Sequence, residues 1–259
     1  MLGAIAGDVI GSIYERNPVN TRDFKLFSTD SIFTDDTVLS VAVAEVLLSD
    51  SSSDYDNTFR QFYRLYPDHG YGYGFSRWVM TDSKEPYNSY GNGSAMRVNP
   101  VGWAFDSLPE VLLEAKKSAM VTHNHVEGIK GAQAVAAAIF LARTGHSKPA
   151  IKDYLSSTFH YDLDRTLNDI RPHYTFDVSC QGSVPESIIA FLESTDYEDT
   201  VRNAVALGGD SDTMACIAGS IAEAYYKYID PEIIAEIFNR LPAHLATITK
   251  QFTGKYCKY

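Results

Sequence analysis

Hydrophobic side chains recur every three to four positions along most of the chain, which is the spacing of one face of an α-helix. Strict alternation of hydrophobic and polar residues, the pattern of a half-buried strand, is nearly absent. The predicted helices cover residues 1–14, 36–48, 56–66, 108–121, 126–144, 148–156, 185–192, 198–207, 213–228 and 231–239. The pattern therefore predicts an all-α bundle.

One long segment, residues 67–98, shows no helical spacing and interleaves glycines with aromatic side chains. An irregular stretch of that length in a compact domain usually has a function. Its aromatic residues include Tyr71, Tyr73, Phe75, Trp78, Tyr87 and Tyr90. These rings would either form the floor of an adenine pocket or pack the segment against the core.

The length and composition predict a single domain, residues 1–259. With 259 residues and 45% hydrophobic content, the chain is long enough to bury one large core. The net charge is −11, and no run of lysine or arginine occurs. This argues against nucleic acid as a general partner, because binding to a phosphate backbone depends on basic side chains.

The three cysteines, Cys180, Cys216 and Cys257, have no C-x-x-C spacing and suggest neither a disulfide framework nor a zinc site. We therefore expect a reduced, cytoplasmic protein. The first residues lack the basic region of a signal peptide and reach Asp8 early, and no segment has the roughly 20 apolar residues of a membrane span. We expect the amino-terminal segment to belong to the fold, and we expect no membrane partner.

Two predicted helices begin with clustered acidic residues. The sequence T-D-D at 34–36 opens one apolar helix, and D-S-D-T at 210–213 opens another. Such residues are ordinary helix N-caps, because their side-chain oxygens accept hydrogen bonds from free backbone N–H groups and acids suit the positive end of a helix. Capping needs only one of the acids at each start. The repetition therefore favours a shared site over two separate caps.

If the two helix starts meet in the fold, four carboxylates lie close together, and protons or cations must neutralise them. Two divalent ions would balance the four charges. Carboxylate, hydroxyl and water oxygens suit Mg²⁺ or Mn²⁺, and a pair of such ions can activate a water and polarise a substrate. No histidine or cysteine lies beside either motif, which disfavours zinc. Gly208 and Gly209 permit close approach by another group.

Six sequence blocks follow one another along the chain. They are GAIAGDVIGSIYE (3–15), FTDDT (33–37), GNGSAMR (91–97) with Pro100, THNH (122–125), GSVPESI (182–188) and GGDSDT (208–213). In this order and on a helical background, they resemble the ADP-ribosylglycohydrolase family, which includes the dinitrogenase reductase-activating glycohydrolase and the ADP-ribosylarginine and ADP-ribosylserine hydrolases. The resemblance implies a single-domain orthogonal helix bundle.

The resemblance also implies a dinuclear Mg²⁺ or Mn²⁺ centre. Its predicted ligands are Thr34, Asp35, Asp36, Asp210, Asp212 and Thr213. The family places a glutamate near the ions and the scissile bond at the position of Glu15, which by itself would be interpreted as a solvated charge at a helix end. Glu15 and Asp36 are therefore the predicted catalytic residues.

The resemblance further implies contacts to the ribose and diphosphate of a substrate. The predicted binding residues are Gly91, Asn92, Gly93, Ser94, Met96, His123, Val184 and Gly209. Small residues in G-N-G-S let backbone amides approach and bind a diphosphate, so no lysine is needed for this contact. The same sequence is also typical of a plain turn. Arg97 is interpreted as a structural ion-pair partner and His125 as a capping or surface residue. Pro185 is predicted to start a helix.

The predicted activity is metal-dependent hydrolysis of the glycosidic bond between ADP-ribose and an acceptor, with release of ADP-ribose. The acceptor classes that stay open are arginine, serine, a small molecule and nucleic acid. Two alternative functions also stay open: a non-catalytic ADP-ribose-binding or structural protein, and a metal-dependent hydrolase that cuts the diphosphate. Four clustered carboxylates favour catalysis, because a scaffold gains nothing from them.

Overall fold

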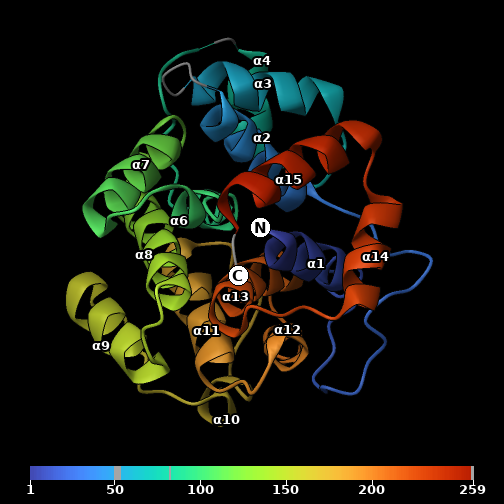
Figure 1. Ribbon diagram of the computed structural model, residues 1–259, viewed down its shortest axis with the longest axis vertical. Coiled ribbons are helices and arrows are strands. Elements are labelled where there is room, and N and C mark those ends of the chain that lie inside the picture. The colour runs from blue at the N-terminus through green and yellow to red at the C-terminus, as the bar shows by residue number, and fades with distance from the viewer. Residues whose placement is uncertain (50–53, 82, 258–259) are drawn as a thin grey trace.

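The computed structural model describes residues 1–49, 54–81 and 83–257 (Figure 1). The helices are α1 (Leu2–Gly11), α2 (Asp35–Leu48), α3 (Tyr55–Leu65), α4 (Tyr73–Met80), α5 (Gly93–Met96), α6 (Val101–Ala104), α7 (Leu108–Met120), α8 (Val126–Arg143), α9 (Lys148–Phe159), α10 (Leu167–Ile170), α11 (Cys180–Leu192), α12 (Tyr197–Val205), α13 (Ser211–Tyr226), α14 (Pro231–Arg240) and α15 (Ala243–Tyr256). Across the described ranges no strand occurs, and the β-type pairing is one isolated bridge between Gly91 and Ser179. The predicted all-α fold is confirmed.

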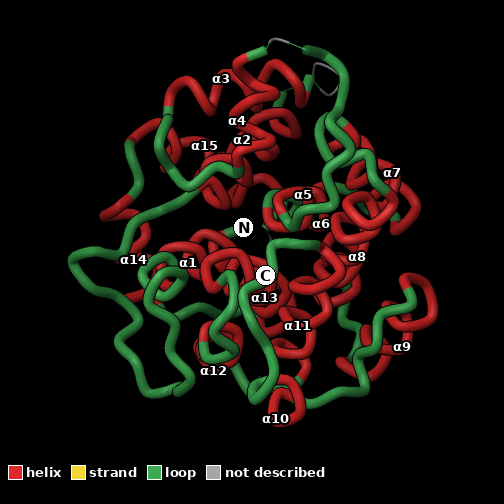
Figure 2. Tube along the Cα trace, turned by 180° about the vertical axis from the view of Figure 1, so that it is seen from behind, coloured by secondary structure: helices red, strands yellow, loops and turns green. Residues whose placement is uncertain are grey.

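Helix α13 lies at the centre of the bundle (Figure 1). It packs along α1 and also contacts α8, α11 and α12. Helix α2 packs against α3 and α15 in the group drawn at the top of Figure 1, and α7 packs on α8 at one side. Seen from behind, the long connection between α1 and α2 passes beside α14 (Figure 2). Arg240 at the end of α14 donates hydrogen bonds to carbonyl oxygens of this connection, at Ser28 and Ser31.

Small residues let α1 and α13 approach each other unusually closely. Helix α1 carries glycine at every fourth position, Gly3, Gly7 and Gly11, and this stripe faces α13. A Cβ atom at Gly7 would lie 2.1 Å from the carbonyl oxygen of Ala215, and one at Gly11 would lie 2.5 Å from Cα of Asp212. Any larger side chain would force the helices apart. The contact thus fixes the start of α13 beside the end of α1.

The segment 67–98 was predicted to be irregular throughout, and this prediction was wrong in part. It contains α4 and the short helix α5. Helix α4 buries Phe75, Trp78 and Val79, whose spacing is helical, but the flanking glycines obscure the pattern. Arg60 of α3 holds the end of α4, because its Nη1 donates to the carbonyl oxygens of Trp78 at 2.8 Å and Val79 at 3.0 Å.

Several other features of the helices differ from the predictions, and the short helices α6 and α10 were not predicted. Helix α11 begins at Cys180, and Pro185 lies inside it, so the prediction that Pro185 starts a helix was wrong. The true start is set by Ser179, whose hydroxyl accepts a hydrogen bond from the backbone N–H of Gly182 at 3.1 Å. Helix α15 was not predicted, although its buried residues have helical spacing. They are Leu245, Ile248, Thr249 and Phe252.

The buried hydrophobic side chains form one continuous cluster that reaches from Met1 to Cys257. Helix α1 is buried along almost its whole length, as expected for an amino-terminal segment that belongs to the fold. The three cysteines are buried and free. In the part of the chain that the structure describes, no helix is both long and apolar enough to cross a lipid bilayer.

Candidate active site

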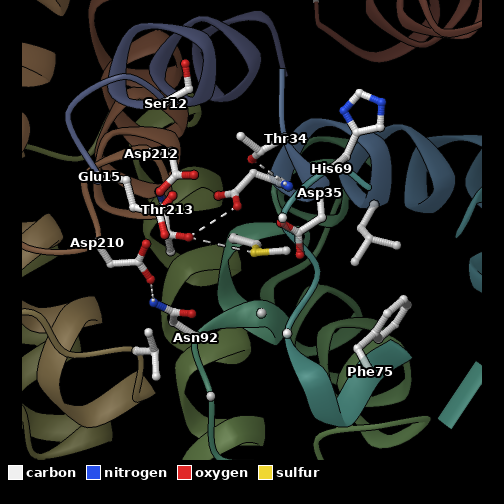
Figure 3. Close-up of a pocket in the computed structure, with 18 of the residues that line it drawn as sticks. Ser12, Glu15, Thr34, Asp35, His69, Phe75, Asn92, Asp210, Asp212 and Thr213 are labelled. Carbon is white, nitrogen blue, oxygen red and sulfur yellow. Dashed lines mark hydrogen bonds between the residues drawn. The ribbon is translucent and has the colours of Figure 1, made fainter. Parts of the chain in front are cut away.

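A cavity of about 890 Å³ lies between the ends of α1, α2 and α13 and the segment that leads into α5. The predicted site residues that line it are Glu15, Thr34, Asp35, Asp36, Gly91, Asn92, Gly93, Met96, His123, Asp210, Asp212 and Thr213. The volume is typical of a small-molecule site. Figure 3 shows the carboxylates of Asp35, Asp210 and Asp212 around one space, with Glu15 beside them.

The two acidic helix starts meet in this cavity. Thr213 Oγ1 of α13 donates a hydrogen bond to Asp36 Oδ2 of α2 at 3.2 Å, although 177 positions separate the two residues (Figure 3). The cap of α2 is Thr34, whose hydroxyl oxygen accepts from the backbone N–H of Asp36 at 3.3 Å. The Asp210 side chain makes no cap bond to α13 and accepts instead from Asn92 Nδ2 at 2.7 Å. The aspartates are therefore not needed as caps.

The carboxyl groups of this cluster resist ionisation in the folded protein. Burial, followed by the negative charges of Asp8 and its neighbours, raises the pKa of Asp36 well above its ordinary value. Burial and then Asp210 and Asp36 do the same to the pKa of Asp212. Burial and like charges also raise the pKa of Asp35. The cluster therefore favours any cation that neutralises it.

The residues present fit a hard divalent cation by their donor chemistry. Asp36 Oδ1 is buried and has no hydrogen-bond partner among the described residues, so a buried lone pair faces no donor. Thr34 and Thr213 line the same cavity, and their hydroxyl oxygens are hard donors as well. Within the described ranges, however, the His, Cys, Asp and Glu side chains alone form no group of three or more that is arranged to hold an ion. The dinuclear centre stays a prediction.

Asp8 is a site residue that the sequence motifs did not single out. It is fully buried in α1, and its Oδ1 accepts a hydrogen bond from the Thr34 hydroxyl at 2.7 Å. Its Oδ2 accepts from the backbone N–H groups of Thr34 at 3.0 Å and Thr37 at 3.1 Å, and also from the Thr37 hydroxyl. Asp8 thereby orients the T-D-D segment. The available signal was its position as the one charge in the apolar sequence 1–14.

Glu15 lies in the turn that follows α1 and lines the cavity. It is partly buried, and burial is the largest cause that raises its pKa. The negative charges of Asp210 and Asp8 raise the pKa further, whereas Arg16 lowers it. A carboxylate with a raised pKa is a stronger base than an ordinary glutamate, so Glu15 has the properties of a proton acceptor.

The G-N-G-S segment contributes backbone and side chains to the cavity wall. Gly91, Asn92 and Gly93 line the cavity, whereas Ser94 is fully buried and its hydroxyl donates to the carbonyl oxygen of Gly128 at 2.7 Å. The segment is held by backbone bonds, from Asn92 N–H to the carbonyl oxygen of Val178 at 2.8 Å and from Cys180 N–H to that of Tyr90 at 2.9 Å. It is thus a fixed wall rather than a free turn.

Two further predicted binding residues lie outside the cavity lining. The Val184 side chain is fully buried in α11. Gly209 lies behind the start of α13, where a Cβ atom would be 2.4 Å from the ring of Tyr174 and 3.0 Å from the sulfur of Met214. Gly209 therefore allows close packing at the start of α13.

The last residues of the GNGSAMR and THNH blocks, Arg97 and His125, have structural roles. His125 is the N-cap of α8, as predicted, because its Nδ1 accepts from the backbone N–H of Glu127 at 3.2 Å. The ion pair predicted for Arg97 is not seen among the described residues. Its buried guanidinium lies 4.2 Å from the centre of the Phe59 ring and donates to the carbonyl oxygen of Ser118 at 2.9 Å. The face of the Phe59 ring stabilises the buried positive charge in place of a carboxylate.

The aromatic side chains of segment 67–98 divide between the two predicted roles. Phe75 and Tyr87 line the cavity. Trp78 is buried in the core, and the Tyr71 ring stacks on Phe75 with 5.6 Å between the ring centres. Tyr73 is exposed. Packing therefore accounts for part of the aromatic content, and two rings remain available to a ligand.

Known proteins resemble this chain over most of its length. The model of the ADP-ribosylglycohydrolase family matches residues 1–256. The ADP-ribosylhydrolase ARH3 of Xenopus tropicalis is 27% identical over 299 residues, which cover 87% of this chain and 85% of the relative. The protein of the same name from Homo sapiens is 27% identical over 304 residues, with coverage of 87% and 84%.

The putative ADP-ribosyl glycohydrolase L543 of Acanthamoeba polyphaga mimivirus is 25% identical over 290 residues and covers 90% of this chain and 87% of the relative. A solved structure described as an ADP-ribosylglycohydrolase-related protein complex has a TM-score of 0.72 and 24% identity, covers 97% of both chains, and therefore shares the fold. Since the model of the family spans residues 1–256, the chain belongs to the ADP-ribosylglycohydrolase family.

Proposed function

We propose that the protein hydrolyses the glycosidic bond between ADP-ribose and an acceptor and releases ADP-ribose. The observation that carries the proposal is the meeting of the two acidic helix starts with Glu15 in one cavity. Buried carboxylates that repel one another are costly to the fold, so their presence in a cavity favours a catalytic role. The family membership and the names of the relatives support the same activity.

Two divalent ions, Mg²⁺ or Mn²⁺, complete the proposed site. Thr34, Asp35, Asp36, Asp210, Asp212 and Thr213 would hold them. When bound, such ions neutralise the carboxylates and polarise hydroxyl groups and water. Asp36 Oδ1 has no hydrogen-bond partner in the described part of the chain, and this observation and the raised pKa values of Asp36 and Asp212 support this part of the proposal.

Glu15 is the proposed general base, and Asp36 is the second candidate. A water beside the anomeric carbon would transfer a proton to the Glu15 carboxylate as its oxygen attacks that carbon. The bond to the acceptor would break with its electron pair on the acceptor, which would then take up the proton from Glu15. The transition state at an anomeric carbon resembles an oxocarbenium ion, so nearby carboxylates stabilise its positive charge. Asn92 holds Asp210 in place through the hydrogen bond from its side-chain amide.

The substrate end of the cavity is formed by the G-N-G segment and His123. The N–H groups of Gly91 and Asn92 already donate to Ser89 Oγ and to the carbonyl oxygen of Val178, so the Gly93 N–H is the backbone donor of this segment that would bind a diphosphate oxygen. Phe75 and Tyr87 offer apolar surface to the remainder of the ligand. The cavity volume of about 890 Å³ is large enough for a nucleotide with its acceptor group.

A product assay tests the proposal against its alternatives. The protein is incubated with ADP-ribose linked to arginine, serine, a small molecule or nucleic acid, in Mg²⁺, in Mn²⁺ and in chelator. Release of ADP-ribose is the expected result. Release of AMP instead would indicate cleavage of the diphosphate, and binding without any product would indicate a non-catalytic protein.

A further inference from the structure

The Thr122 hydroxyl lies between the guanidinium of Arg97 and the imidazole of His123. Arg97 Nη2 is 2.8 Å from Thr122 Oγ1, and this oxygen is 2.7 Å from His123 Nδ1. All three residues are buried, and Arg97 and His123 border the cavity. The three side chains therefore form a hydrogen-bonded chain that ends at the cavity wall.

The chemistry of these groups fixes the direction of the hydrogen bonds. A guanidinium only donates, so Thr122 Oγ1 accepts from Arg97 and keeps its own hydrogen for another acceptor. In the described part of the chain, the acceptor within reach of this hydroxyl is His123 Nδ1. The imidazole proton then resides on Nε2. The opposite tautomer would leave a buried hydroxyl hydrogen without an acceptor, which is unfavourable.

The imidazole of His123 is neutral. Burial is the largest cause that lowers its pKa well below the ordinary value, and the positive charge of Arg97 lowers it further. Burial lowers the pKa of Arg97 itself to about 10, so the guanidinium stays charged at neutral pH. A neutral imidazole carries one proton, and the choice of nitrogen decides whether it offers a donor or an acceptor to its surroundings.

His123 Nε2 faces the two glycines of the G-N-G segment. A Cβ atom at Gly93 would lie 3.2 Å from Nε2, and one at Gly91 would lie 3.7 Å from it. A side chain at position 93 would cover this nitrogen, whereas glycine leaves it open. Since Gly91, Gly93 and His123 all line the cavity, a ligand oxygen above these glycines can reach Nε2.

We propose that Arg97 and Thr122 are positioning residues that hold His123 as the Nε2–H tautomer, which donates a hydrogen bond to a phosphate or hydroxyl oxygen of the ligand. The identity of this ligand as ADP-ribose rests on the proposed function. The tautomer does not, because it follows from bonds inside the protein. Failure of the two ideas can therefore be observed separately.

The first test is an NMR measurement of the ring nitrogens in the full chain at pH 7, with ¹⁵N-labelled histidine and no ligand. His123→Gln identifies the signals of His123 by their disappearance. The expected spectrum shows a protonated, pyrrole-like Nε2 and an unprotonated, pyridine-like Nδ1. A protonated Nδ1, in either the neutral or the charged ring, would overturn the proposal whatever the activity of the protein.

The second test changes the chain of hydrogen bonds. Thr122→Val preserves shape but removes the hydroxyl, so the Nδ1 signal should shift and the affinity for ADP-ribose should fall about tenfold, the loss of one hydrogen bond. Thr122→Ser restores the hydroxyl and should restore both values. Arg97→Met should also shift the Nδ1 signal, because the Thr122 oxygen then no longer has to accept from a guanidinium.

Thr249→Val is the matched control. Thr249 is a fully buried threonine in α15 whose hydroxyl has no hydrogen-bond partner among the described residues. This variant should leave the His123 signals and the affinity for ADP-ribose unchanged. If Thr122→Val behaves like Thr249→Val in the nitrogen spectrum, the chain of hydrogen bonds does not set the tautomer. A correct tautomer without any hydrolysis would uphold this inference and refute the proposed function.

Discussion

Asp8 Oδ1 accepts a hydrogen bond at 2.7 Å from the hydroxyl of Thr34, the residue that caps α2. Asp8 lies in the helix whose glycine stripe packs on α13, so α1 contacts both acidic helix starts at once. The contact with the start of α2 is made by the buried carboxylate of Asp8. The contact with the start of α13 is close backbone packing. The position of Asp36 relative to Asp212 therefore depends on a helix that contributes neither residue.

Asp8→Asn tests this dependence. The amide nitrogen cannot accept hydrogen bonds, so the variant loses part of the contacts from Thr34 and Thr37, at a cost of about 1–3 kcal/mol of unfolding free energy. Removal of one buried charge offsets some of this cost. Urea unfolding and ADP-ribose release measure the two effects, and turnover should fall because the T-D-D segment is no longer held. Asp153→Asn, on the exposed part of α9, should change neither. Wild-type turnover in Asp8→Asn would contradict the positioning role.

Divalent ions should stabilise the folded protein. A ligand that binds only the folded state adds RT ln(1 + [L]/Kd), about 2.7 kcal/mol at a hundredfold excess over Kd. The melting temperature should rise in millimolar Mg²⁺ or Mn²⁺ and return to its starting value in EDTA. Identical melting curves in metal and chelator would remove the dinuclear centre from the proposal.

The same carboxylates predict how stability depends on pH without metal. The pKa of Asp36 is raised well above 3.8 in the folded state, so the folded protein holds protons that the unfolded chain has released. Stability therefore falls as the pH rises from about 4 through the raised pKa. Urea unfolding in EDTA at several pH values measures this slope. Asp36→Asn should flatten it, and saturating Mg²⁺ should reduce it in the wild type. A wild-type slope in Asp36→Asn would show that this carboxyl does not contribute.

Asp36→Asn and Asp212→Asn should each lower turnover by about a hundredfold or more. Asparagine caps a helix as well as aspartate does, and Thr34 is the cap of α2, so helix formation should survive both changes. Because residues that act through one centre are not additive, the double variant should lose little more than either single variant. ADP-ribose release and the metal-dependent rise in melting temperature are measured for all three. Independent effects that multiply in the double variant would indicate two separate sites.

The sequence predicted the meeting of the two acidic helix starts because the apolar residues after 36 and 213 have clear helical spacing and the same acidic chemistry precedes both. It did not single out Asp8, because the partners of Asp8 lie 26 and 29 positions away and one buried aspartate has no pattern of its own. The role of Thr122 was hidden for a related reason. Only the fold shows that its hydroxyl faces Arg97 on one side and the His123 ring on the other.

Glu15→Gln should separate catalysis from metal binding. The pKa of Glu15 is raised by burial and by Asp210, and the deprotonated carboxylate is the proposed base, so kcat/KM of the wild type should rise with pH through that raised pKa. Glutamine cannot accept the proton, and turnover should fall by about a hundredfold or more. The metal-dependent rise in melting temperature should persist. Glu45→Gln, on the exposed side of α2, is the control for the loss of one charge. Loss of the metal effect in Glu15→Gln would make Glu15 a ligand instead.

A glycine-to-alanine substitution should change the unfolding free energy in opposite directions at two positions, one inside the glycine stripe of α1 and one outside it. In Gly7→Ala the new Cβ atom would lie 2.1 Å from the carbonyl oxygen of Ala215, which is backbone and cannot turn aside. The helices must separate, and we expect a loss of about 1–3 kcal/mol of unfolding free energy despite the better helix propensity of alanine. Gly254→Ala lies in α15, where, apart from the backbone of α15 itself, no atom of the described residues is within 4 Å of the new Cβ, and it should stabilise the protein by about 0.5–1 kcal/mol.

Urea unfolding in EDTA measures both variants without any contribution from metal. Gly7→Ala should also weaken the metal-dependent rise in melting temperature, because separation of α1 from α13 moves Asp8 and the T-D-D segment away from Asp212. Gly254→Ala should leave that rise unchanged. If Gly7→Ala stabilised the protein as Gly254→Ala does, the close approach of α1 and α13 would not be present in solution. The link between the glycine stripe and the acidic cavity would then be lost as well.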